Sequence, residues 1–251
     1  MARPIVLTSH LPWCDWVRLA GDAALLFSFG ETPDERVNQQ VLKVARVLAR
    51  AAIPGVVSWV PAYTTLLVEF DPAAWHPATL VDALSGYVET SGEIAERGWT
   101  WEVPVLYGGS HGPDLSEVAQ RLGLSPEEVI AQHSAQPYRI FCLGFAPGFP
   151  LAGLLPPSLR LPRRETPRTQ VYPGAVAIAG AQTGIYPIRT PGGWHLIGET
   201  PVPLFDWSAS PPTVYEPGDR LWFRPIAKEA FDALQRAREN DGLTLRRVSM
   251  E

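Results

Sequence analysis

The sequence predicts an α+β protein in which an N-terminal ferredoxin-like domain precedes a domain of short strands, either a β-barrel or a β-sandwich. In the first hundred residues, extended apolar runs alternate with stretches whose apolar side chains recur at helical spacing. Residues 136–225 instead hold 16 of the 26 prolines and 10 of the 21 glycines, a distribution typical of short strands joined by tight turns. Because proline breaks helix interiors, this composition argues against an all-helical protein.

The first strand is expected at residues 24–29 and leads directly into a helix. Thr32 is expected to cap this helix, with Pro33 in the first helical position and Glu35 completing a capping box. Apolar residues then follow at helical spacing until Pro54 and Gly55, which end the helix.

Four further elements continue the first domain: extended runs at 56–60 and 65–70, a helix at about 77–90 and a strand at 100–106. The order strand, helix, strand, strand, helix, strand is the βαββαβ pattern of ferredoxin-like domains. The last strand could instead open the second domain. We therefore expect an N-terminal α+β domain over 1–97, a β-domain over 98–226, and a C-terminal helix and tail over 227–251.

Two short helices are expected within residues 112–134, capped at Asp114 and Ser125. The stretch resembles a DNA-binding helix-turn-helix, but its second helix begins with Glu127 and Glu128 and offers no basic residue to a groove. We interpret it as a helical insertion that packs on the β-domain, and we expect no nucleic-acid partner. Short strands follow from residue 137, and an amphipathic helix is expected at 227–239.

From the overall composition we expect a soluble cytoplasmic protein. The formal charge is −5, and Cys14 and Cys142 are too few for a disulfide framework or a cysteine-rich zinc site. The N-terminus shows no signal-peptide pattern, and no apolar run is long enough to span a membrane. The five histidines lack metal-ligand spacing, so no metal is expected.

Clustered arginines form the first candidate binding element. The string PRRETPR at 162–168 holds Arg163, Arg164 and Arg168, whose planar guanidinium groups suit a carboxylate or phosphate. On charge alone, a solvated surface loop remains the stronger alternative. The flanking prolines favour a fixed loop and hence a site.

Two further strings could complete a pocket. In AQTGIYP at 181–187, Gln182, Thr183 and Tyr186 could orient a small polar ligand. In PGGWHLIGETP at 191–201, Trp194 beside Gly192 and Gly193 either walls a pocket or plugs the core. The string GFAPGFP at 144–150 lets the backbone approach a ligand, but it lacks the lysine of a phosphate loop and by pattern alone is a structural turn.

His133 and Cys142 could in principle act as a base and a nucleophile. Cys142 lies within an apolar strand, which favours a small buried side chain. His133 closes a short helix, where a protonated ring would suit the helix dipole. For His133, the structural role and the site role remain open.

Taken together, these strings resemble the B subunits of bacterial ATP-dependent 5-oxoprolinase (PxpB), also known as the kinase inhibitor KipI or the first subunit of allophanate hydrolase. The likeness covers most of the chain in the family's order. It rests on GDAALLFSFG at 21–30, PAYTTLLVEFDP at 61–72, YGGSHGPDL at 107–115, LSPEEVIAQH at 124–133, GFAPGFP at 144–150, PRRETPRTQV at 162–171, GAVAIAGAQTGIYPIRTPGGWHLIGETP at 174–201 and EPGDRLWFRPI at 216–226.

The resemblance implies a cyclophilin-like β-barrel for the second domain, similar to part of the carboxyltransferase domain of urea carboxylase. It implies a hydrolase subunit that acts with PxpC-like and PxpA-like partners to open the lactam of 5-oxoproline to L-glutamate with hydrolysis of ATP. No nucleotide motif marks an ATP site in this chain. The site residues that it implies are substrate-binding: Arg163, Arg168, Gln182, Thr183, Tyr186, Gly192, Gly193, Trp194 and His133.

Three positions depart from the family pattern. Leu151 stands where tyrosine is expected, Tyr172 where proline is expected, and Glu199 where arginine is usual. The last departure reverses a charge beside the expected pocket. Two other functions stay open: a regulatory protein that inhibits autophosphorylation of a sensor histidine kinase, and, more weakly, a subunit related to allophanate hydrolase.

Overall fold

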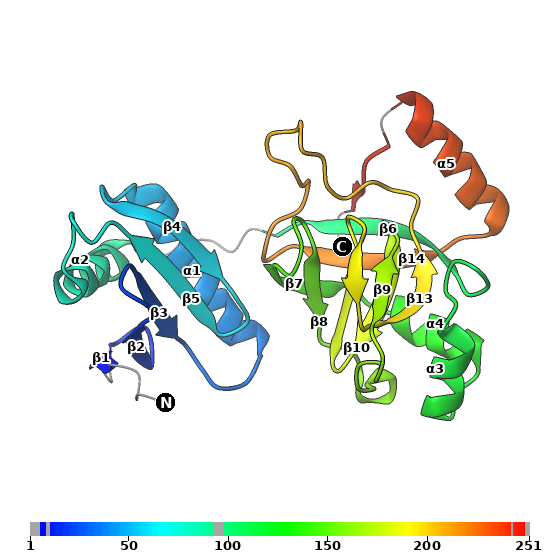
Figure 1. Ribbon diagram of the computed structural model, residues 1–251, viewed down its shortest axis with the longest axis horizontal. Helices are drawn as coiled ribbons and strands as arrows, with labels where there is room; N and C mark the ends of the chain where they lie inside the picture. Colours follow the sequence, from blue (N-terminus) through cyan, green and yellow to red (C-terminus); the bar gives the residue numbers. More distant parts are fainter. Residues whose placement is uncertain (1–5, 9–10, 93–97, 242, 249–251) are drawn as a thin grey trace. The chain divides into compact units, whose positions relative to one another are not determined.

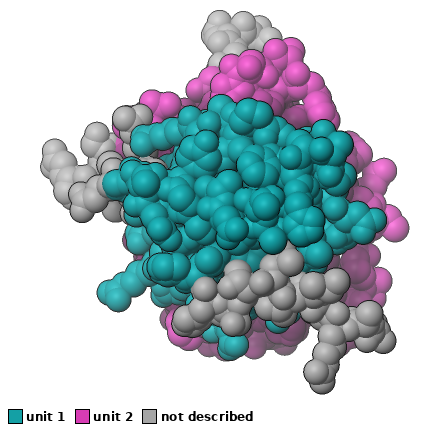
Figure 2. All heavy atoms as spheres, turned by 90° about the vertical axis from the view of Figure 1, so that its left-hand side faces the viewer, with its two compact units in different colours: residues 1–97 teal, residues 98–251 magenta. Residues whose placement is uncertain are grey.

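The computed structural model describes residues 6–8, 11–92, 98–241 and 243–248. It divides into two compact units, Met1–Arg97 and Gly98–Glu251, each with its own hydrophobic core. Figure 1 shows the strands and helices of each unit, and Figure 2 colours the two units separately.

The first unit is one antiparallel sheet with two helices. The strand order is β1-β2-β3-β5-β4, and every neighbouring pair is antiparallel. Helix α1 packs on α2, β4 and β5, so α1 covers the part of the sheet formed by β4 and β5. The elements are β1 (Val6–Thr8), β2 (Trp16–Leu19), β3 (Ala24–Ser28), α1 (Glu35–Ala51), β4 (Val56–Pro61), β5 (Thr65–Phe70) and α2 (Pro77–Thr90).

The expected ferredoxin-like arrangement is not confirmed. Its fourth strand, predicted at 100–106, is β6 (Thr100–Tyr107) and belongs to the second unit. The place beside β3 is taken by β2, an N-terminal strand that the sequence pattern did not reveal. The Thr100–Val105 part of β6 pairs in parallel with the whole of β14 (Arg220–Pro225), which holds β6 in the other sheet.

The start of α1 also differs from the expectation. Asp34, not Thr32, is the N-cap, and its carboxylate accepts hydrogen bonds from the backbone N–H groups of Arg36 and Val37. A carboxylate can accept two backbone donors and interacts favourably with the positive end of the helix dipole, so the helix begins two residues later.

The second unit contains a closed β-barrel of seven strands. The ring runs β13-β10-β11-β8-β7-β14-β6 and closes where β13 pairs with β6. β15 (Arg246–Val248) adds to β6, and β9 pairs with β12 as a separate ribbon. The other elements are β7 (Tyr138–Leu143), β8 (Pro150–Gly153), a 3-10 turn (Pro157–Leu159), β9 (Arg168–Val171), β10 (Ala175–Ala179), β11 (Gln182–Ile185), β12 (Thr190–Gly192) and β13 (His195–Glu199).

Three helices accompany the barrel: α3 (Leu115–Leu122), α4 (Pro126–Ser134) and α5 (Lys228–Asp241). Ser125 and Glu128 form the predicted capping box at α4. Asp114 precedes α3, but its side chain makes no capping hydrogen bond and bonds elsewhere. Within the described residues, no helix is long and apolar enough to cross a membrane.

Strand β10 separates two apolar clusters. Its valine and isoleucine, Val176 and Ile178, join the main barrel core, whereas its alanines, Ala175, Ala177 and Ala179, face a second cluster with Phe149, Tyr186 and Trp194. Alternation along a strand sends successive side chains to opposite faces. The small alanines leave room on that face for three aromatic rings.

Candidate functional site

A cavity of about 340 Å³ lies over this aromatic cluster in the second unit. Its volume falls at the lower end of the roughly 300–1,000 Å³ typical of small-molecule sites. Most of its wall is aromatic or proline side chain. It is lined by Phe145, Phe149, Leu151, Arg163, Pro167, Tyr186, Pro191, Gly192, Gly193 and Trp194.

The ring of Phe149 is the centre of the cavity floor. It meets Tyr186 and Trp194 edge-to-face, with ring centroids 5.0 and 5.4 Å apart. Gly184 on β11 makes this position available, because a Cβ there would lie 2.7 Å from the Pro150 carbonyl and 2.8 Å from the Phe149 ring. Edge-to-face pairs are a favoured aromatic geometry, so these contacts stabilise the position of the Phe149 ring.

Gly192 leaves room for the Tyr186 ring, as Gly184 does for Phe149. A Cβ at Gly192 would overlap the Tyr186 hydroxyl, so glycine lets the phenol reach this wall. The Trp194 backbone hydrogen-bonds the phenol oxygen. Burial raises the pKa of Tyr186, while this hydrogen bond and the charges of Arg163 and Arg168 oppose the rise. The phenol is therefore protonated near neutral pH and available as a hydrogen-bond donor.

Phe145 covers the cavity from the GFAPGFP loop. The residue is 68% exposed, yet its ring packs edge-to-face with Phe149 and Tyr186, at centroid distances of 5.6 and 6.3 Å. Its φ of 70° is left-handed, a conformation that costs a non-glycine residue energy. A loop held in this way places an apolar side chain beside the cavity.

Arg163 supplies the only charge among the described cavity-lining residues. Its side chain is exposed, and no carboxylate in the described part of the chain pairs with it. A guanidinium group offers several donors in one plane and binds carboxylates in a bidentate manner. An aromatic cavity with one free guanidinium suits a small ligand that has an apolar face and a carboxylate.

The same lining residues offer no carboxylate, thiol, imidazole or amine. Such groups are the usual nucleophiles and general bases of hydrolysis. The cavity can therefore bind and orient a ligand, but it lacks a side chain suited to attack it.

Arg168 and Arg164 face a different partner. Nη2 of Arg168 lies 2.6 Å and Nη1 of Arg164 lies 3.1 Å from Oδ1 of Asp114, which is only 4% exposed. The second oxygen of Asp114 accepts the backbone N–H of Leu196 at 2.7 Å. These bonds explain why Asp114 does not cap α3. The arginine cluster is thus divided, with Arg163 at the cavity and the other two holding a buried carboxylate.

His133 and Thr183 lie inside the second unit, away from the cavity lining. Both are 0% exposed, and Nε2 of His133 lies 2.8 Å from the Thr183 hydroxyl. Nδ1 of His133 lies 2.8 Å from the hydroxyl of Tyr107, and Thr183 donates to the Ala177 carbonyl at 3.3 Å. Burial lowers the pKa of His133 to about 3, so its ring is neutral and serves packing and hydrogen bonding.

The remaining predicted side chains also lie outside the cavity lining. Gln182 is half-buried at the start of β11 opposite Gly153. Cys142 is 5% exposed, and burial raises the pKa of its thiol to about 12, which fits the predicted inert side chain. Of the predicted set, the structure brings together Arg163, Tyr186, Gly192, Gly193 and Trp194.

Two of the departures from the family pattern meet at one residue. Oε2 of Glu199 lies 2.7 Å from Nδ1 of His111, and the Tyr172 hydroxyl donates to the His111 carbonyl at 2.5 Å. The ring of His111 also packs on Phe231 of α5, with centroids 4.7 Å apart. Glu199 therefore has a hydrogen-bonding partner of its own and does not line the cavity. The third departure, Leu151, does line the cavity.

Sequence reasoning did not identify Phe145, Phe149 and Pro167 as cavity residues. The string GFAPGFP drew attention for its glycines, whereas its two phenylalanines form the wall and floor. The sequence signal that could have identified these cavity residues was the pair of phenylalanines within a glycine-rich turn. Within the described residues, no cluster of His, Cys, Asp or Glu could hold a metal ion.

The fold and the cavity place the chain in a defined class. Residues 16–215 match the family model described as carboxyltransferase domain, subdomain C and D. The chain is 39% identical to the 5-oxoprolinase B subunit of Bacillus subtilis, over 85% of this chain and 93% of that protein. This chain belongs to the family of 5-oxoprolinase B subunits.

Solved structures share the fold of this chain. The crystal structure of TTHA0988 is 43% identical and superposes with a TM-score of 0.72 over 81% of this chain. The match spans only 40% of that longer chain. The urea carboxylase of Kluyveromyces lactis shares the fold at 19% identity, with a TM-score of 0.77 over 98% of this chain and 25% of that one.

Proposed function

We propose that this chain is the substrate-binding B subunit of a 5-oxoprolinase and that its second-unit cavity holds 5-oxoproline. The observation that carries the proposal is the unpaired guanidinium of Arg163 at an aromatic-walled cavity of about 340 Å³. 5-Oxoproline has one carboxylate, which suits Arg163, and a small ring whose faces suit the aromatic wall. The Tyr186 hydroxyl is a donor for a lactam or carboxylate oxygen.

The described residues that line the cavity include no nucleophile or general base. We therefore expect the chain to be active only as part of a complex. PxpA-like and PxpC-like subunits are the proposed partners, and they would supply the catalytic groups. ATP is the proposed co-substrate. Transfer of its γ-phosphoryl group to the lactam oxygen would make the carbonyl carbon attackable by water. Addition of this water and cleavage of the ring C–N bond, with a proton delivered to the leaving nitrogen, would give an acyl phosphate of glutamate. A second water would then hydrolyse the acyl phosphate, so that the products are glutamate, ADP and phosphate.

The test is reconstitution of the chain with its A and C partners, followed by assay of glutamate and ADP formation from 5-oxoproline and ATP. Glutamate formation should require this chain. Arg163→Gln should raise KM by about tenfold or more, because a charge-assisted bidentate contact is lost. Arg160→Gln is the matched control, since Arg160 lies in the same segment but does not line the cavity.

Two results would overturn the proposal. Equal glutamate formation without this chain would remove its role in the reaction. An unchanged KM in Arg163→Gln would remove the cavity as the carboxylate site.

A further inference from the structure

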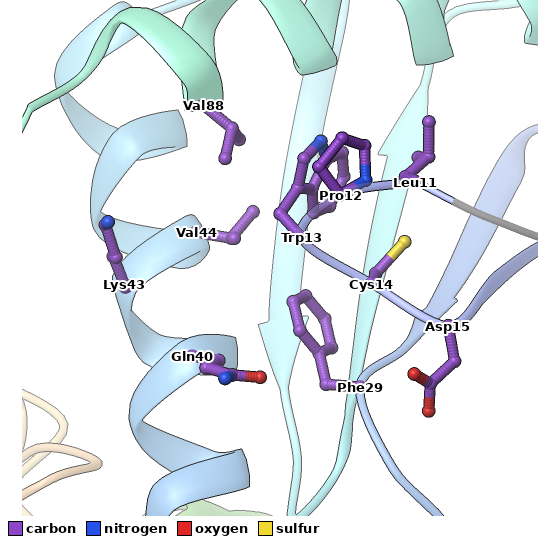
Figure 3. Close-up of a pocket in the computed structure, with 10 residues that line it drawn as sticks. All are labelled: Leu11, Pro12, Trp13, Cys14, Asp15, Phe29, Gln40, Lys43, Val44 and Val88. Atoms are coloured by element: carbon purple, nitrogen blue, oxygen red, sulfur yellow. The ribbon is translucent and has the colours of Figure 1, made fainter.

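A second and larger cavity, of about 670 Å³, lies within the first unit. Figure 3 shows it between the segment Leu11–Asp15 on one side and helix α1 on the other, with Val88 of α2 and Phe29 also facing the space. Its volume falls in the range of small-molecule sites. None of the residues used in the proposed function lines it.

The segment that walls this cavity is firmly attached to the sheet. Leu11 and Cys14 exchange backbone hydrogen bonds of 3.3 Å, which closes a tight turn around Pro12 and Trp13. The ring of Trp13 stacks on the ring of Phe27, with centroids 5.4 Å apart, and its centroid lies 6.1 Å from that of Phe29. This packing fixes the indole as one apolar wall.

Helix α1 supplies the opposite wall with three residues of one face. Gln40, Lys43 and Val44 are spaced i, i+3 and i+4, so their side chains are neighbours on the helix surface. Val44 is 4% exposed and points into the space in Figure 3, while Gln40 and Lys43 are exposed. The cavity thus has an apolar interior and a polar edge on α1.

The charge at that edge belongs to Lys43 on α1. No ion pair joins Lys43 to a carboxylate within the described residues. Its ammonium group sits on a flexible four-carbon stem, so it can reach over the cavity. The amide of Gln40, one turn away, adds further hydrogen-bond donors. Among the described lining residues, Asp15 is the only carboxylate, and it lies on the opposite wall, on a short side chain.

We propose that this cavity binds a small amphipathic carboxylate, with its anionic head at Lys43 and Gln40 and its apolar body against Val44, Trp13 and Phe29. The class includes medium-chain and arylalkyl monocarboxylic acids. The apolar wall removes the hydrocarbon part from water, and the lysine fixes the orientation of the head. This site is separate from the cavity of the second unit.

The test is calorimetric titration of the full chain with sodium octanoate, octan-1-ol and octylamine as probes. Octanoate should bind with one site per chain, and octan-1-ol should bind about tenfold more weakly because it lacks the charge. Lys43→Gln should weaken octanoate binding about tenfold and leave octan-1-ol unchanged. Arg50→Gln, which removes the same charge two turns further along α1, should bind octanoate as the unchanged chain does.

A second pair of variants tests the location. Gln40→Trp adds an indole at the cavity edge and should abolish binding of octanoate and octan-1-ol. Ala49→Trp places the same indole on an exposed position outside the lining and should leave the binding of both compounds unchanged. Far-UV circular dichroism checks that both variants fold. Absence of octanoate binding, octanoate binding unchanged in Gln40→Trp or Lys43→Gln, or tighter binding of octylamine would each overturn the proposal.

Discussion

Nη2 of Arg168 lies 2.6 Å from Oδ1 of Asp114, a carboxylate that is almost entirely buried. Arg168 was expected to hold a substrate carboxylate, yet the structure gives it a carboxylate of the protein itself. The bond joins β9 to the start of α3, and the other oxygen of Asp114 ties the same point to β13 through Leu196. This ion pair therefore supports the segment next to Arg163.

Arg168→Gln should lower the free energy of unfolding by about 1–3 kcal/mol. Removing one partner of a buried ion pair leaves a poorly compensated charge, although Arg164 still contacts Asp114. Arg163→Gln is the contrasting variant and should change stability by less than about 0.5 kcal/mol, because Arg163 is exposed and unpaired. Urea unfolding followed by tryptophan fluorescence measures both. Equal stability of the two variants would contradict a structural role for Arg168.

Gly192→Ala should disturb the aromatic wall of the second-unit cavity. The added methyl group would fall on the Tyr186 hydroxyl and force the phenol away from the Trp194 backbone. We expect a loss of about 1–3 kcal/mol in unfolding free energy, typical of overpacking. Gly193→Ala is a close control, since its Cβ would only reach ordinary contact with Pro167 at 3.6 Å. Equal melting temperatures of the two variants in thermal unfolding would contradict this packing.

His133 should make stability depend on pH in a specific direction. Its pKa is about 3 in the folded protein and about 6.5 when unfolded, so between these values the unfolded chain binds a proton that the native protein does not. The unfolding free energy therefore falls as the pH falls below about 6.5, by up to about 1.4 kcal/mol per pH unit. Above pH 7 the contribution is fully present.

Comparison with His133→Gln isolates this contribution. The stability gap between the unchanged chain and the variant should narrow as urea unfolding is repeated from pH 7 to pH 4.5. Tyr107→Phe removes one hydrogen bond but keeps the histidine. The difference in unfolding free energy between this variant and the unchanged chain should therefore not narrow as the pH falls. An NMR titration of the His133 ring provides an independent measurement. A midpoint near pH 6.5 would contradict the buried neutral ring.

Much of the local structure follows from the sequence alone. Helical spacing and the break at Pro54 and Gly55 locate α1, and the pair Ser125 and Glu128 locates the start of α4. The prolines and glycines of residues 136–225 predict short strands and tight turns. These features depend on backbone propensities and on residues a few positions apart, which a single sequence displays.

Strand pairing could not be predicted in the same way. The run 100–106 fits either sheet by its pattern. Its pairing with β14, more than a hundred residues later, and with β13 assigns it to the barrel. The edge beside β3 is filled by β2, whose short run carries no clear alternation. Partners distant in sequence decide such assignments, so local patterns do not contain them.

By itself, the sequence determined which residues could form a site, because the chemistry of Arg163, Tyr186 and Trp194 belongs to the side chains. Only the tertiary structure decided which of them meet. Along β11, Thr183 turns inward to His133, whereas the neighbouring Gly184 turns outward to admit Phe149. Successive residues of a strand face opposite sides, and the closed barrel makes one side the core and the other the cavity.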